Sequence, residues 1–270
     1  MKQSLNYLLF FIALTMLASC TSQKVQSPKK VSNEIKVMSY NVHHCNPPDQ
    51  KNKIDVDAIA AVIKAQNADV VALQEIDVNT GRSGKINQAE LLAKKASYPS
   101  FYFAKAMDFD GGQYGLLILS KHPLTNMQTI MLPRTDPKKD EPRVLALATV
   151  NLANGKSFQF GSTHLEAYNK ASRLQQIQKI QQVASQSNIP FIVAGDFNDV
   201  AGKEVINILD QSFTRTCQTC PNTFDEEGES GAIDFIAFKK GSPFEVKSHQ
   251  VLSTIKTSDH FPLTAILKWK

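Results

Sequence analysis

The chain has 270 residues and a formal net charge of +5; 42% of its residues are hydrophobic and 20% are charged. This composition argues against a disordered chain and is enough for one large domain or two small ones. The weak positive charge permits an anionic substrate but does not identify one.

Residues 1–19 have the pattern of a secretory signal peptide. Lys2 precedes an apolar run (Leu5–Leu17) that is too short for a typical membrane-spanning helix, and small residues then lead into Cys20. The Leu-Ala-Ser-Cys ending resembles the bacterial lipoprotein signal, in which the cysteine is lipidated. We therefore expect a lipid-anchored protein of the bacterial cell envelope, in which residues 20–33 comprise the lipidated Cys20 and a flexible, polar tether.

From residue 34 to residue 270 the pattern predicts one domain of the α/β class, because apolar runs typical of strands alternate with helical spacing. The Asn154-Gly155 pair predicts a hairpin between two of the strands. In chain order the expected elements are strand 35–42, helix 56–66, strand 68–75, helix 89–96, strand 114–120, strands 143–152 and 158–164, helix 171–187, strand 190–196, a helix near 203–209, and strands 232–238 and 261–269.

The three cysteines after Cys20 do not suggest a zinc site. Cys217 and Cys220 form a single CxxC pair with no second pair elsewhere, so a local disulfide or free thiols are favoured. His43, His44 and Cys45 are consecutive, and neighbours on a strand point to opposite faces, so they are not expected all to meet one metal.

Polar residues recur where the predicted strands begin or end. Such residues are poor strand formers and are costly to bury unpaired, so one of them could belong to a turn, whereas a whole set of similar character suggests one shared pocket. In open α/β sheets, active sites lie beyond the carboxyl ends of the strands. The residues are Asn41, Glu75, His164, Asp196, Asn198, Asp234, Asp259 and His260.

The chemistry of this set is coherent. Carboxylate and carboxamide oxygens suit a hard cation such as Mg²⁺, which keeps water ligands that a substrate phosphate can replace. A histidine oriented by an aspartate can activate water, and a further histidine and asparagine can bind phosphate oxygens. Neither a GxSxG elbow nor a P-loop or GxGxxG motif is present to suggest another chemistry.

Six ordered motifs carry a family resemblance. They are Asn41, Leu73-Gln74-Glu75, Ser162-Thr163-His164-Leu165, Gly195-Asp196-Phe197-Asn198, Ile233-Asp234-Phe235 and Ser258-Asp259-His260. Over roughly residues 35–268 the chain thereby resembles the endonuclease/exonuclease/phosphatase superfamily, which has the deoxyribonuclease I-like fold. The resemblance implies a four-layer α/β sandwich, with two packed mixed β-sheets flanked by helices, and metal-dependent phosphoester hydrolysis.

The resemblance also implies a metal site. Asn41 and Glu75 would hold the ion, with Glu75 as the main ligand, and Asp259 would share that ion or hold a second one. The expected cofactor is Mg²⁺, with Mn²⁺ or Ca²⁺ as alternatives. His43 and His44 stand where some relatives carry an acidic residue, so His43 is interpreted as part of the pocket wall.

The remaining roles implied by the resemblance belong to the reaction itself. His260 would activate the attacking water or stabilise the phosphoryl group, and Asp234 would orient it. Asp196 would position the nucleophile or help protonate the leaving oxygen. Asn198 and His164 would bind the phosphate.

Two further residues are candidates for substrate binding. The family places a tyrosine and an arginine variably near the substrate, and Tyr114 and Arg143 are the residues that could fill these roles here. Tyr114 could equally be an aromatic residue at a strand edge, whereas a guanidinium such as that of Arg143 suits phosphate geometrically.

The sequence therefore predicts a metal-dependent hydrolase of phosphoester bonds, expected to be a monomer held at the membrane by its lipid. The alternative from another class is a binding lipoprotein that has lost catalysis, but the complete set of site residues argues against it. The substrate stays open among nucleic acid, phospholipid head groups and sugar phosphates. A sphingomyelinase-like or inositol-phosphate-specific enzyme is the leading alternative to a nuclease.

Overall fold

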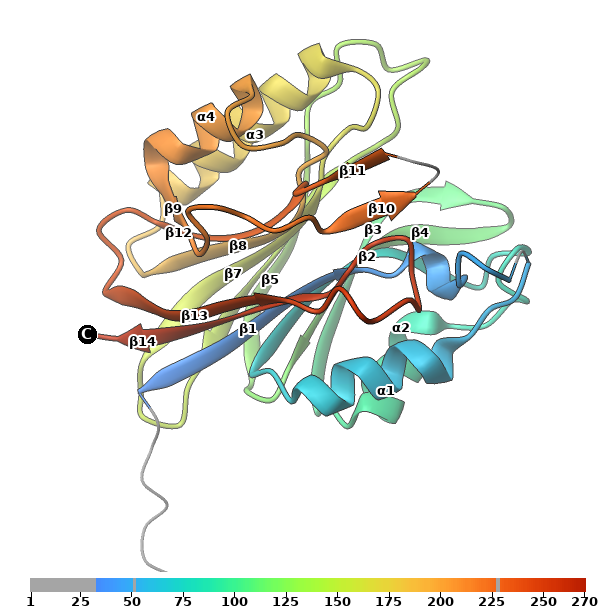
Figure 1. Ribbon diagram of the computed structural model, residues 1–270, viewed down its shortest axis with the longest axis horizontal. Coiled ribbons are helices and arrows are strands. Elements are labelled where there is room, and N and C mark those ends of the chain that lie inside the picture. The colour runs from blue at the N-terminus through green and yellow to red at the C-terminus, as the bar shows by residue number, and fades with distance from the viewer. Residues whose placement is uncertain (1–32, 51, 227–228) are drawn as a thin grey trace, which may run out of the picture. The chain divides into compact units, whose positions relative to one another are not determined.

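The computed structural model describes residues 33–50, 52–226 and 229–270 (Figure 1). The predicted signal peptide, the lipidation site Cys20 and the tether up to residue 32 lie outside the described residues. Of the helices that the structure describes, none has both the length and the apolar character needed to cross a membrane.

Two mixed six-stranded sheets form the centre of the fold. Sheet I has the order β13 (Phe244–Val251), β14 (Leu263–Trp269), β1 (Glu34–Asn41), β2 (Val70–Val78), β4 (Gly112–Ser120) and β3 (Ser100–Phe109). Sheet II has the order β5 (Leu124–Met131), β6 (Val144–Asn151), β7 (Ser157–His164), β8 (Phe191–Asp196), β12 (Asp234–Lys239) and β9 (Phe213–Arg215). The pairs β1–β2 and β7–β8 are parallel, and the other pairs are antiparallel.

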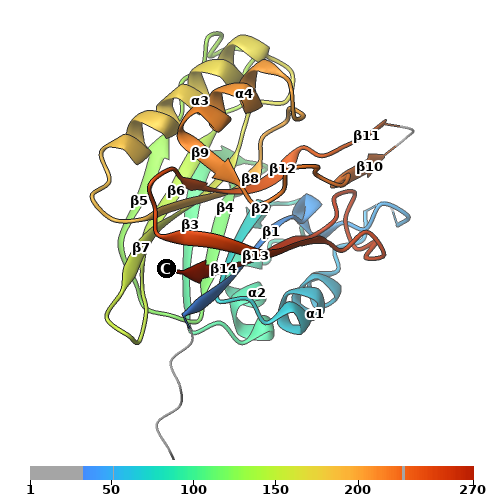
Figure 2. The same ribbon diagram turned by 60° about the vertical axis from the view of Figure 1, so that its left-hand side comes forward.

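Helices cover the outer face of each sheet (Figures 1 and 2). Helices α1 (Val56–Gln66) and α2 (Gln88–Ala96) pack on sheet I, and α3 (Lys170–Ser185) and α4 (Glu204–Ser212) pack on sheet II. A third apolar core lies between the two sheets. These layers confirm the predicted four-layer α/β sandwich.

Helix α1 illustrates how local sequence fixes an element. Its residues Val56, Ile59, Ala60 and Ile63 recur at helical spacing and are all buried against sheet I. The side chain of Asp55 caps the amino end by accepting a hydrogen bond from the backbone N–H of Ala58 at 3.0 Å. Each fully buried isoleucine contributes about 1.5–3 kcal/mol to the packing of the helix on the sheet.

The strand register brings the polar strand ends together. His164 at the end of β7 pairs with Asp196 at the end of β8, and Asp196 pairs with Asp234 at the start of β12. In sheet I the parallel pair β1–β2 ends beside Asn41, and Gln74 Nε2 donates to Ser162 Oγ of sheet II at 3.2 Å. The carboxyl ends of the central strands of both sheets therefore meet at one edge of the sandwich.

Gly195 allows the close approach that places Asp196. Its φ is +150°, and a Cβ there would lie 1.9 Å from the carbonyl oxygen of Thr163 on the neighbouring strand. We expect Gly195→Ala to lower the free energy of unfolding by at least about 2 kcal/mol, because it combines backbone strain with a clash against rigid backbone. Chemical denaturation measures this loss.

Gly155→Ala is the matched control. Gly155 also has a positive φ, +80°, but no atom lies within 4 Å of a Cβ built there. Gly155→Ala therefore strains the backbone without causing a clash, and we expect it to lower the free energy of unfolding by about 1 kcal/mol. Equal losses in the two variants would contradict the role given to the contact with Thr163.

Candidate active site

A cavity of about 370 Å³ opens at the edge where the central strands end. Several of the residues predicted from the sequence line it, namely Glu75, Tyr114, Arg143, His164, Asp196, Asn198, Asp259 and His260. Asn41 and Asp234 lie just behind this surface, where both are buried and hydrogen-bonded to lining residues. The fold thus brings all the predicted catalytic, metal-binding and substrate-binding residues of the domain into one place.

His260 is held and charged by Asp234. Its Nδ1 lies 2.8 Å from Asp234 Oδ2, and the same carboxylate oxygen accepts a hydrogen bond from Thr223 Oγ1 at 2.7 Å. Burial opposes protonation of the imidazole, but the attraction of the Asp234 carboxylate outweighs burial and raises the pKa of His260 to about 10. His260 is therefore a fixed cation at neutral pH.

Asp196 faces both histidines of the site. Its Oδ2 lies 3.4 Å from His164 Nε2 and 3.7 Å from His260 Nε2, and it accepts a hydrogen bond from Asn41 Nδ2 at 3.2 Å. Burial, together with repulsion from Asp234, raises the pKa of Asp196 to about 7. A carboxyl with such a pKa can take and release a proton at neutral pH.

Glu75 projects from an irregular point of β2. The pairing of β2 with β4 shifts between Leu73 and Ile76, and Glu75 has a φ of +60°, so the bulge turns its side chain into the site. Its Oε1 accepts a hydrogen bond from Asn41 Nδ2 at 3.0 Å. Burial acts to raise the pKa of Glu75, but contacts with His44, His164 and Asn41 hold it well below its usual range, so Glu75 is ionised.

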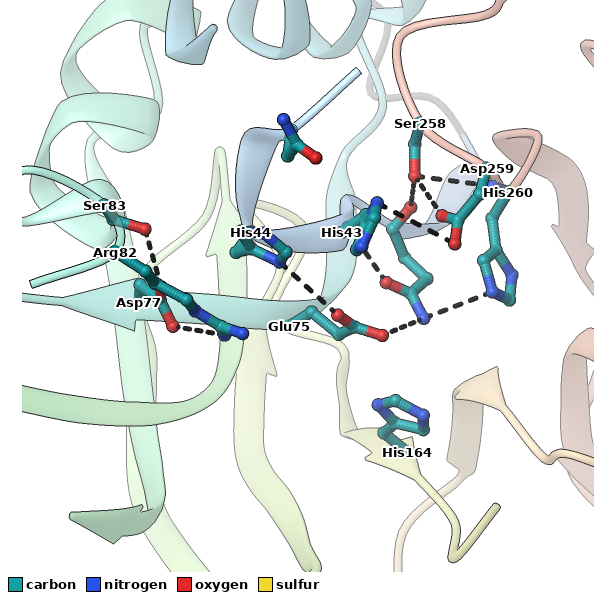
Figure 3. Close-up of polar contacts among 12 residues, drawn as sticks. His43, His44, Glu75, Asp77, Arg82, Ser83, His164, Ser258, Asp259 and His260 are labelled. Atoms are coloured by element: carbon teal, nitrogen blue, oxygen red, sulfur yellow. Dashed lines mark hydrogen bonds and ion pairs between the residues drawn. The ribbon is translucent and has the colours of Figure 1, made fainter. Parts of the chain in front are cut away.

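Asn41 donates a hydrogen bond to this carboxylate, and Asp259 lies nearby, beyond His43 (Figure 3). The Asn41 Oδ1 accepts a hydrogen bond from the backbone N–H of His43 at 3.1 Å, which leaves Nδ2 facing Glu75 and Asp196. Asn41 would thus need to turn its amide before Oδ1 could bind a cation beside Glu75. Asp259 has one oxygen, Oδ1, held by Ser258 Oγ at 2.9 Å, while its Oδ2 lies 3.8 Å from His43 Nδ1.

His164 and Asn198 form the opposite wall. Burial, and then the charge of Arg143, lowers the pKa of His164 well below its usual value, so this imidazole is neutral. Asn198 has a φ of +49°, and its Nδ2 donates to the carbonyl of Leu165 at 2.9 Å. Both residues present neutral polar groups to the cavity.

Two arginines line the cavity, of which only one was predicted. Arg143 is buried, with Nη2 2.6 Å from Glu141 Oε2, and within the described part of the chain its Nε has no hydrogen-bond partner. Arg82 was missed: its Nε and Nη2 contact the buried Asp77 at 2.7 and 2.9 Å. Arg82 lies in the loop after β2 and not at the end of a strand, so the pattern of polar strand ends did not include it. Its bidentate pairing with Asp77 can be recognised only from the structure.

Tyr114 and the outer rim are aromatic. Tyr114 on β4 is buried, and burial, followed by the nearby Glu75 charge, raises its pKa well above the usual value, so it keeps its hydroxyl proton.

Phe109 packs under Arg82, whose guanidinium carbon lies 4.5 Å from the ring centroid. Tyr168 is 96% exposed at the rim, and the Phe224 ring centroid is 4.9 Å from that of His260. Sequence reasoning identified none of these rim residues except Tyr114.

None of the three cysteines that the structure describes lines this cavity. Cys217 and Cys220 form a disulfide, one of the two states favoured by the sequence, and Cys45 is a free thiol buried in the core between sheet I and its helices. His43 and His44 do not continue strand β1, which ends at Asn41. They lie in a short 3₁₀ turn, η1 (His43–Cys45), so the strand alternation assumed for them does not apply.

Comparisons with known proteins agree with this geometry. A family model described as the Endonuclease/Exonuclease/phosphatase family matches residues 38–260. No curated protein matches the chain.

Solved structures provide a likeness of fold. An endonuclease/exonuclease/phosphatase from Bacteroides vulgatus is 21% identical with a TM-score of 0.74, covering 88% of this chain and 99% of that one. A mannosyl-6-phosphatase from Bacteroides thetaiotaomicron is 18% identical with a TM-score of 0.70, covering 86% and 99%. A humanized D. rerio TDP2 is 20% identical with a TM-score of 0.68, covering 87% and 99%.

Proposed function

Because the chain belongs to the endonuclease/exonuclease/phosphatase family, we propose that it is a Mg²⁺-dependent hydrolase that cleaves phosphoester bonds by attack of water. Members of this family are hydrolases of phosphoester bonds and typically use a divalent metal ion. The observation that carries the proposal for this chain is the buried row Asp234–His260–Asp196 beside the ionised Glu75. One cavity thus combines a fixed cation, a carboxyl that titrates near neutrality and a permanent anion.

The protonation states of His260 and Asp196 at neutral pH indicate the part that each would take in the reaction. His260 carries its proton at neutral pH, so it suits stabilisation of the phosphoryl charge better than removal of a proton from water. Asp196, with a pKa of about 7, is the better group to accept that proton and to return it to the leaving oxygen. Arg143, His164 and Asn198 face the same cavity and would hold the phosphate.

The donor groups of the site fit a hard divalent cation. Glu75 is ionised, and its Oε1, which accepts a hydrogen bond from Asn41 Nδ2 at 3.0 Å, would become free for a cation once that amide turns. Glu75 and Asp259 would hold the ion, joined by Asn41 if its amide turns. When bound, the ion would supply Lewis-acid stabilisation of the phosphate oxygens.

The location and partners are proposed from the amino-terminal sequence. Residues 1–19 would be removed as a signal peptide, and Cys20 would carry the lipid that anchors a monomeric enzyme at the bacterial cell envelope. The substrate would then be a phosphoester reachable at that surface. Nucleic acid, a phospholipid head group and a sugar phosphate all carry the group that the cavity suits.

The test is hydrolysis by the purified protein in Mg²⁺ and again in excess EDTA. The panel contains supercoiled DNA, single-stranded RNA, bis-p-nitrophenyl phosphate, sphingomyelin, inositol phosphates and mannose 6-phosphate. We expect one class to be cleaved, with the activity lost in EDTA and restored by added Mg²⁺. Cleavage that persists in EDTA would contradict metal dependence, and no cleavage of any compound would favour the non-catalytic binding lipoprotein.

A further inference from the structure

Two adjacent imidazoles stand beside the catalytic cavity without a role in the proposed reaction. One ring nitrogen of His43, one of His44 and a carboxylate oxygen of Glu75 all lie within 4.8 Å of one another. The His44 Nδ1 is 3.9 Å from Glu75 Oε2, and the His43 Nδ1 is 3.8 Å from Asp259 Oδ2. Figure 3 shows both rings on the same side of the Glu75 carboxylate, with Asp259 beyond His43.

The two Nδ1 atoms are buried, and neither has a hydrogen-bond partner among the residues that the structure describes. A buried polar atom without a partner costs about 1–3 kcal/mol, so each such atom in a folded protein calls for an explanation. Each Nδ1 lies near a carboxylate oxygen but beyond hydrogen-bond distance of it. This spacing is expected of groups that share one metal ion as ligands. The edge-to-face contact of the two rings, with centroids 4.5 Å apart and planes at 79°, leaves both nitrogens near Glu75.

The backbone is strained in order to present both rings. His43, His44 and Cys45 have φ values of +46°, +43° and +63°, a left-handed conformation that is uncommon for residues other than glycine. Strain of this kind costs of order 1–3 kcal/mol per residue and clusters at ligand-binding positions. Here it turns two successive side chains toward one point, which an extended strand would not do.

Surrounding contacts hold the turn in place. The Cys45 thiol is buried in the core beneath it, and the carbonyl of Cys45 accepts a hydrogen bond from the backbone N–H of Asp55 at 2.7 Å. The carbonyl of His44 accepts a hydrogen bond from Gln88 Nε2 at 2.7 Å. The imidazoles therefore project from a fixed support, as a metal site requires.

The two oxygens of Glu75 face different groups. Oε1 accepts a hydrogen bond from Asn41 Nδ2, on the side of Asp196, whereas Oε2 faces His44. A carboxylate in this position can serve the oxygen-rich site on one side and the imidazoles on the other. The ligand type then decides the ion, since imidazole nitrogen suits Zn²⁺, Co²⁺ and related transition metals, whereas Mg²⁺ prefers oxygen.

The geometry points to a second cation site, formed by His43, His44 and Glu75, that selects a divalent transition-metal ion over Mg²⁺. Asp259 is placed to act as a fourth ligand through Oδ2. This assignment replaces the interpretation of His43 as pocket wall. Binding of an ion at these residues does not depend on whether the neighbouring cavity hydrolyses phosphoesters.

Metal binding by the untagged, metal-free protein tests the site directly. We expect Co²⁺ to bind with a visible absorption spectrum typical of nitrogen ligation, to be displaced by Zn²⁺, and to stay bound in a large excess of Mg²⁺. His43→Asn and His44→Asn should each weaken binding at least 10-fold, because asparagine tolerates the left-handed backbone but removes the imidazole. Displacement by equal concentrations of Mg²⁺, or unchanged binding in both variants, would overturn the assignment.

His122→Asn is the matched control. His122 also lies near a carboxylate, with Nε2 3.8 Å from Asp69 Oδ1, but among the described residues it belongs to no cluster of three possible metal ligands. Its replacement should leave Co²⁺ binding unchanged, and an equal loss would contradict the site.

A second measurement uses the unaltered chain and so does not depend on the folding of a variant. Bound Zn²⁺ should protect His43 and His44, but not His122, from chemical acylation as read by mass spectrometry. Equal modification with and without Zn²⁺ would count against the site. Because neither measurement involves substrate, their failure would leave the hydrolysis result unaffected.

Discussion

Replacing Asp234 with asparagine is expected to lower kcat by about 10³-fold while leaving the protein folded. The Asp234 carboxylate provides the largest attraction that keeps His260 charged, with its oxygen 2.8 Å from Nδ1. An asparagine can still accept the hydrogen bond from Thr223 Oγ1, but it can no longer balance an imidazolium. The imidazole should then become neutral and lose the charge that stabilises the phosphoryl group.

Two measurements check this expectation. The first is kcat on the compound that the panel identifies, and the second is the pKa of His260 by NMR titration, which should fall from about 10 toward or below its ordinary value. A variant that keeps more than a tenth of the wild-type kcat, or whose His260 pKa is unchanged, would refute the role of Asp234.

Asp225→Asn provides the control for this variant. Asp225 lies on the neighbouring strand β10 (Phe224–Glu226), and its exposed side chain is 3.8 Å from Lys256 Nζ. The substitution removes the same charge from the same region of the molecule without touching His260. Its kcat should stay within about twofold of wild type, since exposed ion pairs contribute little.

The central strands could be predicted because burial on both faces leaves a continuous apolar run. Strands β1, β2 and β8 were predicted on that basis, and the structure confirms them. The outer strands β3, β5 and β13 escaped prediction. They lie at the edges of the two sheets, and most of their residues are exposed or half-buried, so they lack the long buried run that marks the central strands.

That the candidate residues lie close together could be predicted by the same reasoning, whereas the geometry of their contacts could not. Polar residues at strand ends had to share one edge of the sandwich, and the register of His164, Asp196 and Asp234 shows why. Arg82 and the orientation of the Asn41 amide depend on loop contacts that strand periodicity does not encode.

Backbone strain was equally invisible in the sequence. Glu75 and Asn198 lie in the left-handed region, as do His43 and His44, and no glycine signals these positions. Such strain is maintained by the surrounding fold and concentrates where side chains must be aimed. The assumption that His43 and His44 alternate as on a strand failed for this reason.

Asp196→Asn is expected to lower the activity of the protein and, above neutral pH, to raise its stability. Asp196→Asn should lower kcat by about 10²- to 10⁴-fold, because the amide cannot accept a proton from water. The wild-type kcat/KM should rise as the pH passes about 7, where Asp196 loses its proton, and the residual activity of the variant should lack that step.

The same substitution should stabilise the fold above neutral pH. An unfolded aspartate titrates near 3.9, whereas Asp196 keeps its proton up to about pH 7 in the folded protein. Between these values the folded state binds the extra proton, so rising pH lowers the free energy of unfolding by up to about 1.4 kcal/mol per pH unit. The asparagine side chain stays neutral at every pH. The free energy of unfolding of Asp196→Asn, relative to that of the wild type, should therefore rise from pH 4 to pH 7 and then level off.

Donor groups around the side chain limit this gain. Asp196 accepts hydrogen bonds from the backbone N–H of Asn198 at 2.8 Å and from Asn41 Nδ2 at 3.2 Å, and asparagine can accept only through its one oxygen. A lost hydrogen bond offsets about 1 kcal/mol of the roughly 4 kcal/mol that the pKa difference of about three units represents, so we expect a net gain of up to about 3 kcal/mol at pH 8. Urea denaturation of both proteins at pH 4.5 and pH 8 measures the difference.

Asp199→Asn is the matched control, because Asp199 follows closely in the chain and accepts a hydrogen bond only from the backbone N–H of Val200 among the described residues. It should change neither kcat nor the pH dependence of stability. If Asp196→Asn were less stable than wild type at both pH values, the burial of an ionised Asp196 would not be the source of the raised pKa. If it kept more than a tenth of the wild-type kcat, Asp196 would not be the group that exchanges the proton, and the cation of His260 would have to work beside a different base.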